Sequence, residues 1–339
     1  MTCCPKITIL VVSLLISIPV TLASIFLSKK WGFFDQPQIE KHKAHAKPTP
    51  LAGGISLFIT LFLVELIFGH QWADLGVHSG YFIAGAVVIF LVGLLDDIFI
   101  FSALIKFLGQ LLGVVLVILA GFSISLFPNT IVNIAVTLFW YIGIINAFNF
   151  LDGSDGMILQ AGIVITSFAF FFTNLSGQMS LQNFILAILG ILLGLLIFNF
   201  RPAKMFMGDA GSQLVGLLLA LIVLNYNPLG FDRTSSWITP VLMMSVPIFD
   251  VTLVVISRLL RKIPVAIGGL DHTYHRLVLK GIPPQFATIL IVIAVAVTNG
   301  LAHLTLIIDR SYAYIIFAVA LLIGGFLLIW LERTFQPEK

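Results

Sequence analysis

The chain has 339 residues, of which 59% are hydrophobic and only 10% are charged, and its formal net charge is +3. Soluble domains carry about 25% charged residues, so the composition excludes an ordinary soluble domain and places most of the chain in lipid. Two cysteines are too few for a disulfide framework or a four-ligand zinc site. We expect no nucleic-acid partner.

Apolar segments follow one another along the whole chain, and about 20 apolar residues cross a bilayer as one helix. The first segment is followed by Lys29 and Lys30, the reverse of a signal peptide's charge order, so we interpret it as a retained helix. Because several segments are short, we expect ten or eleven transmembrane helices in an all-α polytopic membrane protein. The segments are residues 7–28, 51–69, 81–95, 104–122, 130–148, 157–173, 182–199, 211–226, 237–257, 286–307 and 312–331.

The basic residues indicate how these helices are oriented. With eleven helices, 15 of the 18 Lys and Arg residues fall in one alternating set of loops, and only Lys6, Arg233 and Arg310 fall in the other. Loops rich in Lys and Arg face the cytoplasm. The N-terminus is therefore expected outside and the C-terminus in the cytoplasm. Most carboxylates fall on the cytoplasmic side, so we expect an active site that faces the cytoplasm.

Five aspartates occupy three of the cytoplasmic loops: Asp96 and Asp97, Asp152 and Asp155, and Asp209. Carboxylates at one membrane depth repel one another, and ionisable groups there are usually functional. Mg²⁺ would relieve this repulsion, because it binds one or two carboxylates together with substrate phosphates. Adjacent helical residues point about 100° apart, so the first two aspartates cannot readily chelate one ion together. The alternative, that these aspartates are helix caps, is disfavoured by their grouping.

A loop with cations and histidines follows the ninth segment. The cations within residues 258–262 are explained as cytoplasmic anchors. His272 and Arg276 are four residues apart, with His275 beside them, so one helical turn would bring them together. Such a group suits a pyrophosphate or a sugar phosphate. Zinc binding by the two histidines is the alternative, although no third ligand of the usual type lies nearby.

The loop after the first segment contains Lys41, His42 and further lysines. These lysines could bind anionic lipid headgroups or the phosphate of a lipid substrate, and the sequence leaves both alternatives open.

Taken in order, these motifs resemble those of the polyprenyl-phosphate N-acetylhexosamine-1-phosphate transferases. The resemblance extends from Asp35 to about Ile282, nearly the whole chain. Five motifs in the family's order, all on one membrane face, make it specific. The matching pieces are Lys41-His42 with Pro48, Pro50 and Gly53-Gly54; Asp96-Asp97 with Lys106 and Gln110; residues 146–156; residues 206–212; and residues 247–250 with the His272/His275 loop.

The resemblance implies a single integral-membrane transferase domain over residues 1–339 that depends on Mg²⁺, with Mn²⁺ as an alternative. It would transfer a HexNAc-1-phosphate, with GlcNAc-1-phosphate as the first choice, from a UDP-sugar to undecaprenyl phosphate. The products would be undecaprenyl-diphosphate-sugar and UMP. Such a reaction initiates cell-envelope polysaccharides such as O-antigen at the bacterial inner membrane. The family also suggests a homodimer.

The resemblance assigns roles residue by residue. Asp209 would be the principal Mg²⁺ ligand with Asp97 beside it, and Asp96 would be the base for the lipid phosphate. The remaining candidates would bind substrate: the basic pair Lys41 and His42; Lys106 on phosphate; Asn149, Asp152 and Asp155 on the nucleotide; and His272, His275 and Arg276 on the donor's pyrophosphate and sugar.

One departure concerns the histidine loop. Family members that use UDP-GlcNAc commonly have His-x-His-His, whereas here Tyr274 stands between His272 and His275. The sugar specificity therefore stays open, and the absence of three consecutive histidines argues against the peptidoglycan translocase.

Two other classes of protein carry membrane carboxylates. An ion-coupled transporter should hold them at the bilayer midplane in broken helices, often in repeated halves, and no internal repeat is evident. A Mg²⁺-dependent membrane prenyltransferase would need neither the Asp209 loop nor the histidines.

Overall fold

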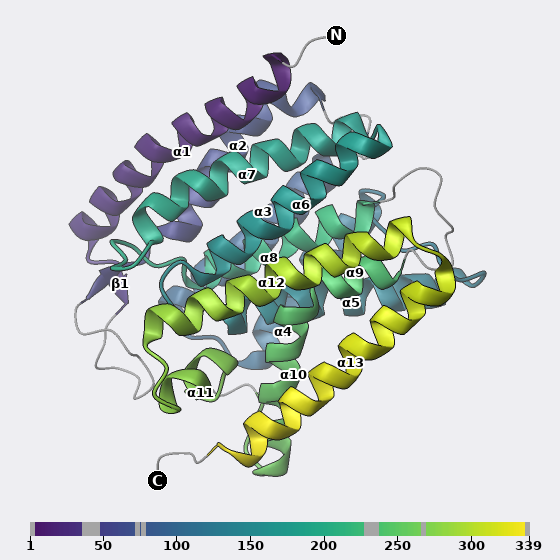
Figure 1. Cartoon of the computed structure of the whole chain (residues 1–339). Helices are drawn as coiled ribbons and strands as arrows, with labels where there is room; N and C mark the ends of the chain where they lie inside the picture. The colour runs from purple at the N-terminus through teal and green to yellow at the C-terminus, as the bar shows by residue number, and fades with distance from the viewer. Residues whose placement is uncertain are drawn as a thin grey trace. The chain divides into compact units, whose positions relative to one another are not determined.

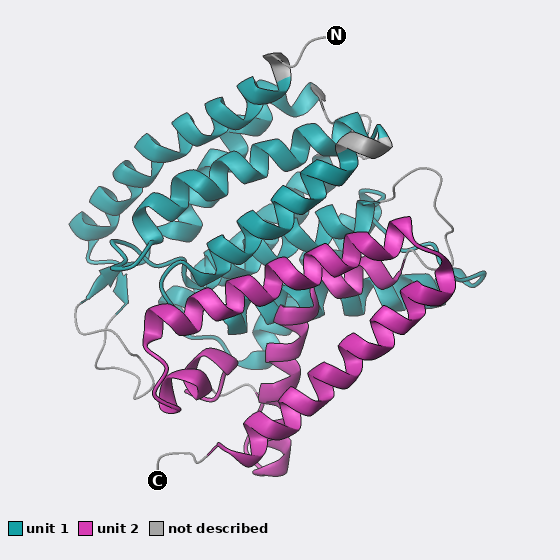
Figure 2. Cartoon of the chain, in the orientation of Figure 1, with its two compact units in different colours: residues 1–228 teal, residues 229–339 magenta. Residues whose placement is uncertain are grey.

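The computed structural model describes residues 4–35, 48–71, 75, 79–226, 237–265 and 269–335. Within these ranges the chain is almost entirely helical (Figure 1). It forms two compact units, residues 1–228 and residues 229–339 (Figure 2). The all-α architecture predicted from the sequence is confirmed, whereas the single transferase domain stays a prediction.

The first unit holds the larger set of helices and one short hairpin. In the hairpin, two strands pair antiparallel, with Phe34 opposite Pro50 and Asp35 opposite Thr49. The described elements are α1 (Cys4–Trp31), β1 (Phe34–Asp35), β2 (Thr49–Pro50), α2 (Gly53–Phe68), η1 (Gly69–Gln71), α3 (Ser79–Phe99), α4 (Ala103–Leu119), α5 (Thr130–Leu151), α6 (Met157–Ser176), α7 (Met179–Asn199) and α8 (Gly208–Asn225).

The second unit contains a helix that is broken within the predicted ninth segment. Pro247 has no N–H to donate to the carbonyl of Met243, four residues earlier, and the side chain of Asn299 donates to that carbonyl instead at 3.2 Å. The segment is therefore split at Met244. The described elements are α9 (Ile238–Met243), α10 (Ser245–Leu260), α11 (Thr273–Leu279), α12 (Pro284–Ile307) and α13 (Arg310–Arg333).

Many of these helices are suited to a bilayer. Among the described residues, seven are long and apolar enough to span it, namely α1, α3, α5, α7, α8, α12 and α13. Three shorter apolar helices, α2, α4 and α6, accompany them. Each segment predicted from the sequence contains a helix, and the chain is a multi-pass membrane protein.

The core of the first unit is built on α7 and α8. Their most apolar windows are 78% buried, against 33% for α1, α3 and α5. Helix α8 packs against α2, α3, α5 and α6. A residue at the start of α8 is therefore surrounded by the ends of several other helices.

Helix α1 packs along α7 through small residues (Figure 1). Ser13, Ser17 and Thr21 on α1 are all fully buried, and their four-residue spacing places them on one face. Gly190 and Gly194 of α7 lie against this face, and a Cβ added at Gly190 would lie 2.9 Å from Ser13 Cβ. Small residues allow helix backbones to approach closely in lipid, where no hydrophobic effect drives helices together.

Candidate active site

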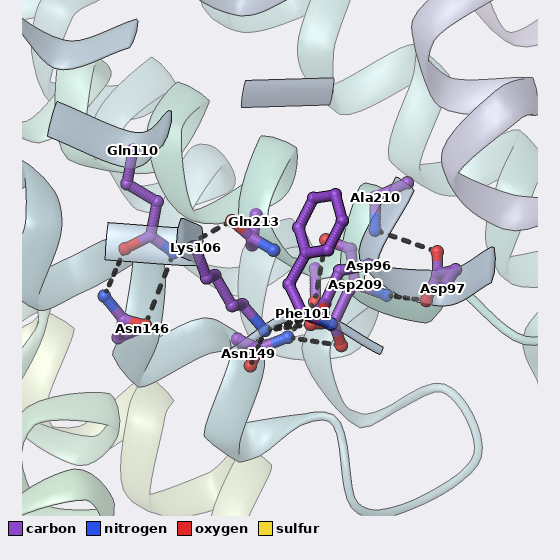
Figure 3. A network of polar contacts seen from close by, with 11 residues as sticks. Asp96, Asp97, Phe101, Lys106, Gln110, Asn146, Asn149, Asp209, Ala210 and Gln213 are labelled. Carbon is purple, nitrogen blue, oxygen red and sulfur yellow. Dashed lines mark hydrogen bonds and ion pairs between the residues drawn. The ribbon is translucent and has the colours of Figure 1, made fainter. Parts of the chain in front are cut away.

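The ends of four helices bring polar side chains together within the first unit (Figure 3). Asp96 and Asp97 lie in the last turn of α3, and Lys106 in the first turn of α4. Asn149 lies near the end of α5, and Asp209 is the second residue of α8. These residues were predicted from three different loops, and the structure groups them in one cluster.

The Lys106 ammonium is the centre of this cluster. Its Nζ lies 2.9 Å from Asp96 Oδ2 and forms a short ion pair with Asp209 Oδ2. It also contacts Asn149 Oδ1 at 3.4 Å. The Lys106 side chain is 18% exposed, so the ammonium is held largely among these oxygen atoms. The cluster is therefore a set of hard oxygen ligands arranged around one cation.

Asp97 points away from Asp96, as helical geometry predicts for adjacent residues. Its Oδ1 accepts the Asp209 N–H at 2.8 Å, and its Oδ2 accepts the Ala210 N–H at 3.1 Å. A carboxylate is stabilising at a helix N-terminus, where backbone N–H groups have no partner within the helix. Gly208 begins α8 at φ 66°, and a Cβ there would lie 2.7 Å from Asp97 Oδ2. Asp97 thus anchors the first turn of α8, which carries Asp209.

Asn149 joins α5 to the same turn. Its Nδ2 donates to Asp209 Oδ1 and to Ser212 Oγ, each at 2.9 Å. The Asp209 carboxylate therefore has both oxygens engaged, one by Lys106 and one by Asn149.

A short extended segment ties the hairpin to the loop before Asp209. Phe206 N–H donates to the Pro50 carbonyl, Gly53 N–H to the Phe206 carbonyl, and Gly54 N–H to the Met207 carbonyl, at 2.9 to 3.0 Å. A Cβ at Gly53 would lie 2.5 Å from the Met207 sulfur, which explains the glycine at this close approach. The predicted substrate-binding residues Lys41 and His42 lie outside the described residues.

Asp152 and Asp155 follow the end of α5 and differ in their contacts. Asp155 Oδ2 accepts the Ala203 N–H at 3.1 Å, which fixes the loop between α7 and α8. Partial burial, together with the negative charges of Asp209, Asp155 and Asp35, raises the pKa of Asp152 to about 8. A carboxyl with so high a pKa requires a nearby positive charge to ionise fully at neutral pH.

The donor set of the cluster fits Mg²⁺. Within the residues that the structure describes, no three His, Cys, Asp or Glu side chains form a ready-made metal site. Mg²⁺ sites commonly use one or two carboxylates and complete the octahedron with water and substrate phosphate. Asp96 and Asp209, which converge on one ammonium, supply that number of carboxylates. The zinc alternative for His272 and His275 has no third ligand in the described part of the chain.

The histidine loop lies in the second unit and is held by a residue that sequence analysis left without a role. Asp250 on α10 is 1% exposed. Its Oδ2 lies 2.9 Å from His272 Nδ1, and its Oδ1 accepts the Thr273 N–H at 2.7 Å. Asp250 therefore orients the imidazole and anchors the start of α11. Its position at the end of the matching Pro247–Asp250 motif was the available signal.

A second carboxylate, Asp271, pairs with the cations that were predicted to be membrane anchors. Arg258 donates to both Asp271 oxygens, at 2.9 and 2.7 Å, and Arg261 donates at 2.6 Å. Burial would raise the pKa of Asp271, but the hydrogen bonds and charge of the two guanidinium groups outweigh it and hold that pKa well below its usual range. These arginines thus hold Asp271, the residue that precedes His272.

Arg276 has contacts that differ from its predicted role. It is 1% exposed, and it donates to the Asp271 and Leu331 carbonyls and, at 2.8 Å, to Glu332 Oε2. Its guanidinium also stacks on the Phe335 ring at 4.2 Å. The structure therefore joins Arg276 to the end of α13, and this arrangement favours a structural role over contact with a donor pyrophosphate. His275 lies on the same helix with its ring 5.7 Å from that of His272.

Asp271→Asn is expected to lower stability at neutral pH by on the order of 3–5 kcal/mol, because it leaves the buried Arg258 guanidinium and the partly exposed Arg261 guanidinium without their carboxylate. The folded pKa lies below the unfolded value of about 3.9, so the ion pair contributes fully above that value. Its contribution is lost as the pH falls below it. Thermal unfolding in detergent between pH 7 and pH 3 should show that the variant loses less stability on acidification than the wild type. Parallel wild-type and variant curves offset by a constant would contradict the assignment.

The fold and this cluster define a multi-pass, all-α membrane protein with an acidic site built on one lysine. The chain matches glycosyl transferase family 4 over residues 79–227, which include Asp96, Asn149 and Asp209. It is 29% identical over 293 residues to a probable undecaprenyl-phosphate N-acetylglucosaminyl 1-phosphate transferase of Bacillus subtilis, covering 83% of this chain and 79% of that one. These two matches confirm the resemblance seen in the motifs.

Two further relatives show how the similarity is distributed. An undecaprenyl-phosphate alpha-N-acetylglucosaminyl 1-phosphate transferase of Thermotoga maritima is 27% identical over 313 residues, with 89% of this chain and 91% of the relative covered. A phospho-N-acetylmuramoyl-pentapeptide-transferase of Streptococcus pneumoniae is 36% identical over 191 residues, but only 51% of this chain and 58% of the relative are covered. The similarity to N-acetylglucosaminyl 1-phosphate transferases is therefore the more complete in length.

Proposed function

We propose that the chain transfers GlcNAc-1-phosphate, or a closely related HexNAc-1-phosphate, from a UDP-sugar to undecaprenyl phosphate. An oxygen of the lipid phosphate forms a bond to the β-phosphorus of the donor. The bond from that phosphorus to the oxygen bridging the two phosphates breaks, so UMP leaves and undecaprenyl-diphosphate-sugar remains. At the cytoplasmic side of a bacterial inner membrane, this reaction would initiate a cell-envelope polysaccharide such as O-antigen.

The observation that carries this proposal is the meeting of Asp96, Asp209 and Lys106 at one end of the helices. Donor and acceptor are both phosphate anions, and phosphoryl transfer asks a protein mainly to position its reactants and to stabilise charge. A cation flanked by carboxylates serves both needs, because the carboxylates can hold Mg²⁺ while the lysine contacts phosphate. The names of the relatives supply the substrate class.

The residues of the cluster would divide the work. When the donor binds, the Lys106 ammonium would exchange part of its contact with Asp96 and Asp209 for contact with a donor phosphate. Asn149 would hold Asp209 in place through its 2.9 Å hydrogen bond. Asp96 would accept the proton of a monoprotonated lipid phosphate. Mg²⁺, held chiefly by Asp209, would neutralise charge on the donor pyrophosphate. Asp97, which was predicted as a second ligand, accepts two backbone N–H groups of α8 and would instead keep Asp209 in place. We favour direct attack by the lipid phosphate over an aspartyl-phosphate intermediate, since positioning and charge stabilisation suffice.

In this proposal, the histidine loop contacts the donor. Asp250 orients His272 by a 2.9 Å contact, and an imidazole ring held in this way would suit hydrogen bonding to a phosphate or a sugar hydroxyl group. The ring of Tyr274 lies edge-on to His275, with centroids 5.2 Å apart. Because Tyr274 stands where UDP-GlcNAc-using relatives commonly have a histidine, we expect this loop to decide which HexNAc is accepted.

The direct test is transfer of radiolabel from UDP-GlcNAc to undecaprenyl phosphate by the purified full-length chain in detergent with Mg²⁺. Labelled lipid and UMP should form in equal amounts, and EDTA should abolish both until Mg²⁺ or Mn²⁺ is restored. UDP-GalNAc assayed in parallel would measure the sugar preference. If no UDP-HexNAc yields labelled lipid, the proposal fails, and solute uptake by reconstituted vesicles would be examined next.

A further inference from the structure

A second group of polar residues lies next to the cluster, on three of its four helices, α4, α5 and α8. Gln110 on α4 is four residues after Lys106, Gln213 on α8 is four residues after Asp209, and Asn146 on α5 is three residues before Asn149. Residues three or four apart share one face of a helix. Each helix therefore carries one residue of the cluster and, one turn farther along its axis, one residue of this second group (Figure 3). We call Gln110, Asn146 and Gln213 the amide layer.

The amide layer is joined by hydrogen bonds that cross all three helices. Gln110 Nε2 donates to Gln213 Oε1 at 2.9 Å, and Asn146 Nδ2 donates to Gln110 Oε1 at 2.8 Å. Gln110 Nε2 also contacts Asn146 Oδ1 at 3.4 Å. Gln110 is 1% exposed and Gln213 is fully buried. Gln110 is therefore the link between α5 and α8.

Stability alone does not account for these residues. Interhelical hydrogen bonds in membrane proteins contribute little net stability, and replacing both partners of a buried bond by apolar groups of the same shape can be nearly neutral. Moreover, the Nε2 atom of Gln213 is buried and has no hydrogen-bond partner among the described residues. An unsatisfied buried donor costs free energy that a methionine of similar shape would avoid. The amide layer instead constrains geometry. Its hydrogen bonds form only when each helix has one rotation about its axis and one position along it.

We propose that the amide layer positions the residues of the neighbouring cluster. By fixing the rotation and height of α4, α5 and α8, it sets the separation of Lys106, Asn149 and Asp209. None of its residues needs to touch substrate. The predicted effect of the amide layer on the transfer rate rests on the proposed function. Its predicted effect on the structure of the cluster does not.

The structural consequence can be measured without any substrate. Asp209 and Ala210 donate their N–H groups to Asp97 only while α8 keeps its register. Hydrogen exchange of a peptide covering residues 206–214 should therefore be faster in Gln213→Met, which removes the acceptor for Gln110. Gln213→Glu keeps that acceptor and should exchange like the wild type.

Gln182 supplies a matched control within the same unit. It lies on α7, it is fully buried, and both of its side-chain polar atoms lack a partner within the described part of the chain. Gln182→Met removes a buried amide outside the layer, so it should leave the 206–214 exchange and the transfer rate unchanged. A general response to losing any buried amide would appear in both variants, whereas a positioning role would appear only in Gln213→Met.

The catalytic consequence is a fall in kcat with little change in the donor KM. Displacement of a catalytic group by about 1 Å can cost roughly 100-fold in rate, so we expect Gln213→Met to lose about 10- to 100-fold in kcat. Gln213→Glu should recover most of this loss. Gln110→Met should lose as much as Gln213→Met, and the double variant no more than either, because residues that act as one unit are not additive.

The outcomes separate the two proposals. If the wild type transfers no sugar phosphate, the proposed function fails, and the exchange experiment alone decides the fate of the amide layer. Wild-type exchange and wild-type kcat in Gln213→Met would overturn the positioning role. Equal effects of Gln213→Met and Gln182→Met would also overturn it, because they would show a structural loss common to buried amides.

Discussion

Asp209→Asn is expected to lower the transfer rate about a thousandfold, the scale of losing a principal electrostatic contact in a preorganised site. The variant keeps an oxygen that can accept from Asn149, but it loses the charge that pairs with Lys106 and that would bind Mg²⁺. The folded structure should survive, because the backbone N–H of residue 209 still donates to Asp97. Steady-state transfer with purified variant and thermal unfolding in detergent would measure the two effects.

Lys106 offers a second view of the same contact. Lys106→Met should cause a loss of similar size, and combining it with Asp209→Asn should add little, since the two residues act through one ion pair. Lys204, an exposed lysine in the loop before α8, is the matched control. Lys204→Met should retain nearly full activity. A double variant far slower than either single one would show that Lys106 and Asp209 contribute separately.

The positions of the membrane helices could be predicted because lipid imposes a simple requirement on composition and length. Even the break at Met244 has a local cause, since Pro247 cannot bond to the Met243 carbonyl. What the sequence could not show is that the side chain of Asn299, 56 residues after Met243, donates a hydrogen bond to that carbonyl. Contacts between distant residues depend on how helices pack, and hydropathy carries little information about packing.

In the candidate site, likewise, the residues could be predicted from the sequence but their contacts could not. Asp96, Asp97 and Asp209 could be singled out because ionisable groups within membrane segments are costly, and their grouping on one side was visible in the loops. The pairing of Asp97 with the first turn of α8 spans 112 residues and was not visible. Similarly, the spacing of His272 and Arg276 correctly suggested one helical turn, but the partner of Arg276 is Glu332 on another helix.

The amide layer marks an intermediate case. Each of its residues lies three or four positions from a residue of the cluster on the same helix. Gln110 and Gln213 could therefore have been found by asking which polar residues have this spacing from a candidate. Periodicity identifies such residues, but only the structure shows that they bond to one another across helices.

Gly93→Ala is expected to reduce the transfer rate about 100-fold, although Gly93 carries no functional group. Gly93 lies on α3 one turn before Asp97, and an added Cβ would lie 2.5 Å from Ala210 Cα and 2.7 Å from the Asp209 carbonyl carbon. Backbone atoms cannot yield as side chains do, so α3 and α8 must separate. The separation would weaken both hydrogen bonds from α8 to Asp97 and displace Asp209, and displacement of about 1 Å has a cost of this size. Overpacking of this kind also costs typically 1–3 kcal/mol of stability.

The same substitution at Gly143 provides the control that separates packing from helix propensity. Gly143 lies within α5, and a Cβ added there would meet nothing within 4 Å. Alanine is favoured over glycine within helices by roughly 0.5–1 kcal/mol, so Gly143→Ala should unfold at the same or a higher temperature and retain full activity. Transfer rate, melting temperature and hydrogen exchange of residues 206–214 would be measured for both variants. If Gly93→Ala matches Gly143→Ala in all three, the close approach of α3 to α8 does not determine the position of Asp209; if it lowers the rate and speeds that exchange, the geometry of the cluster depends on the absence of one methyl group.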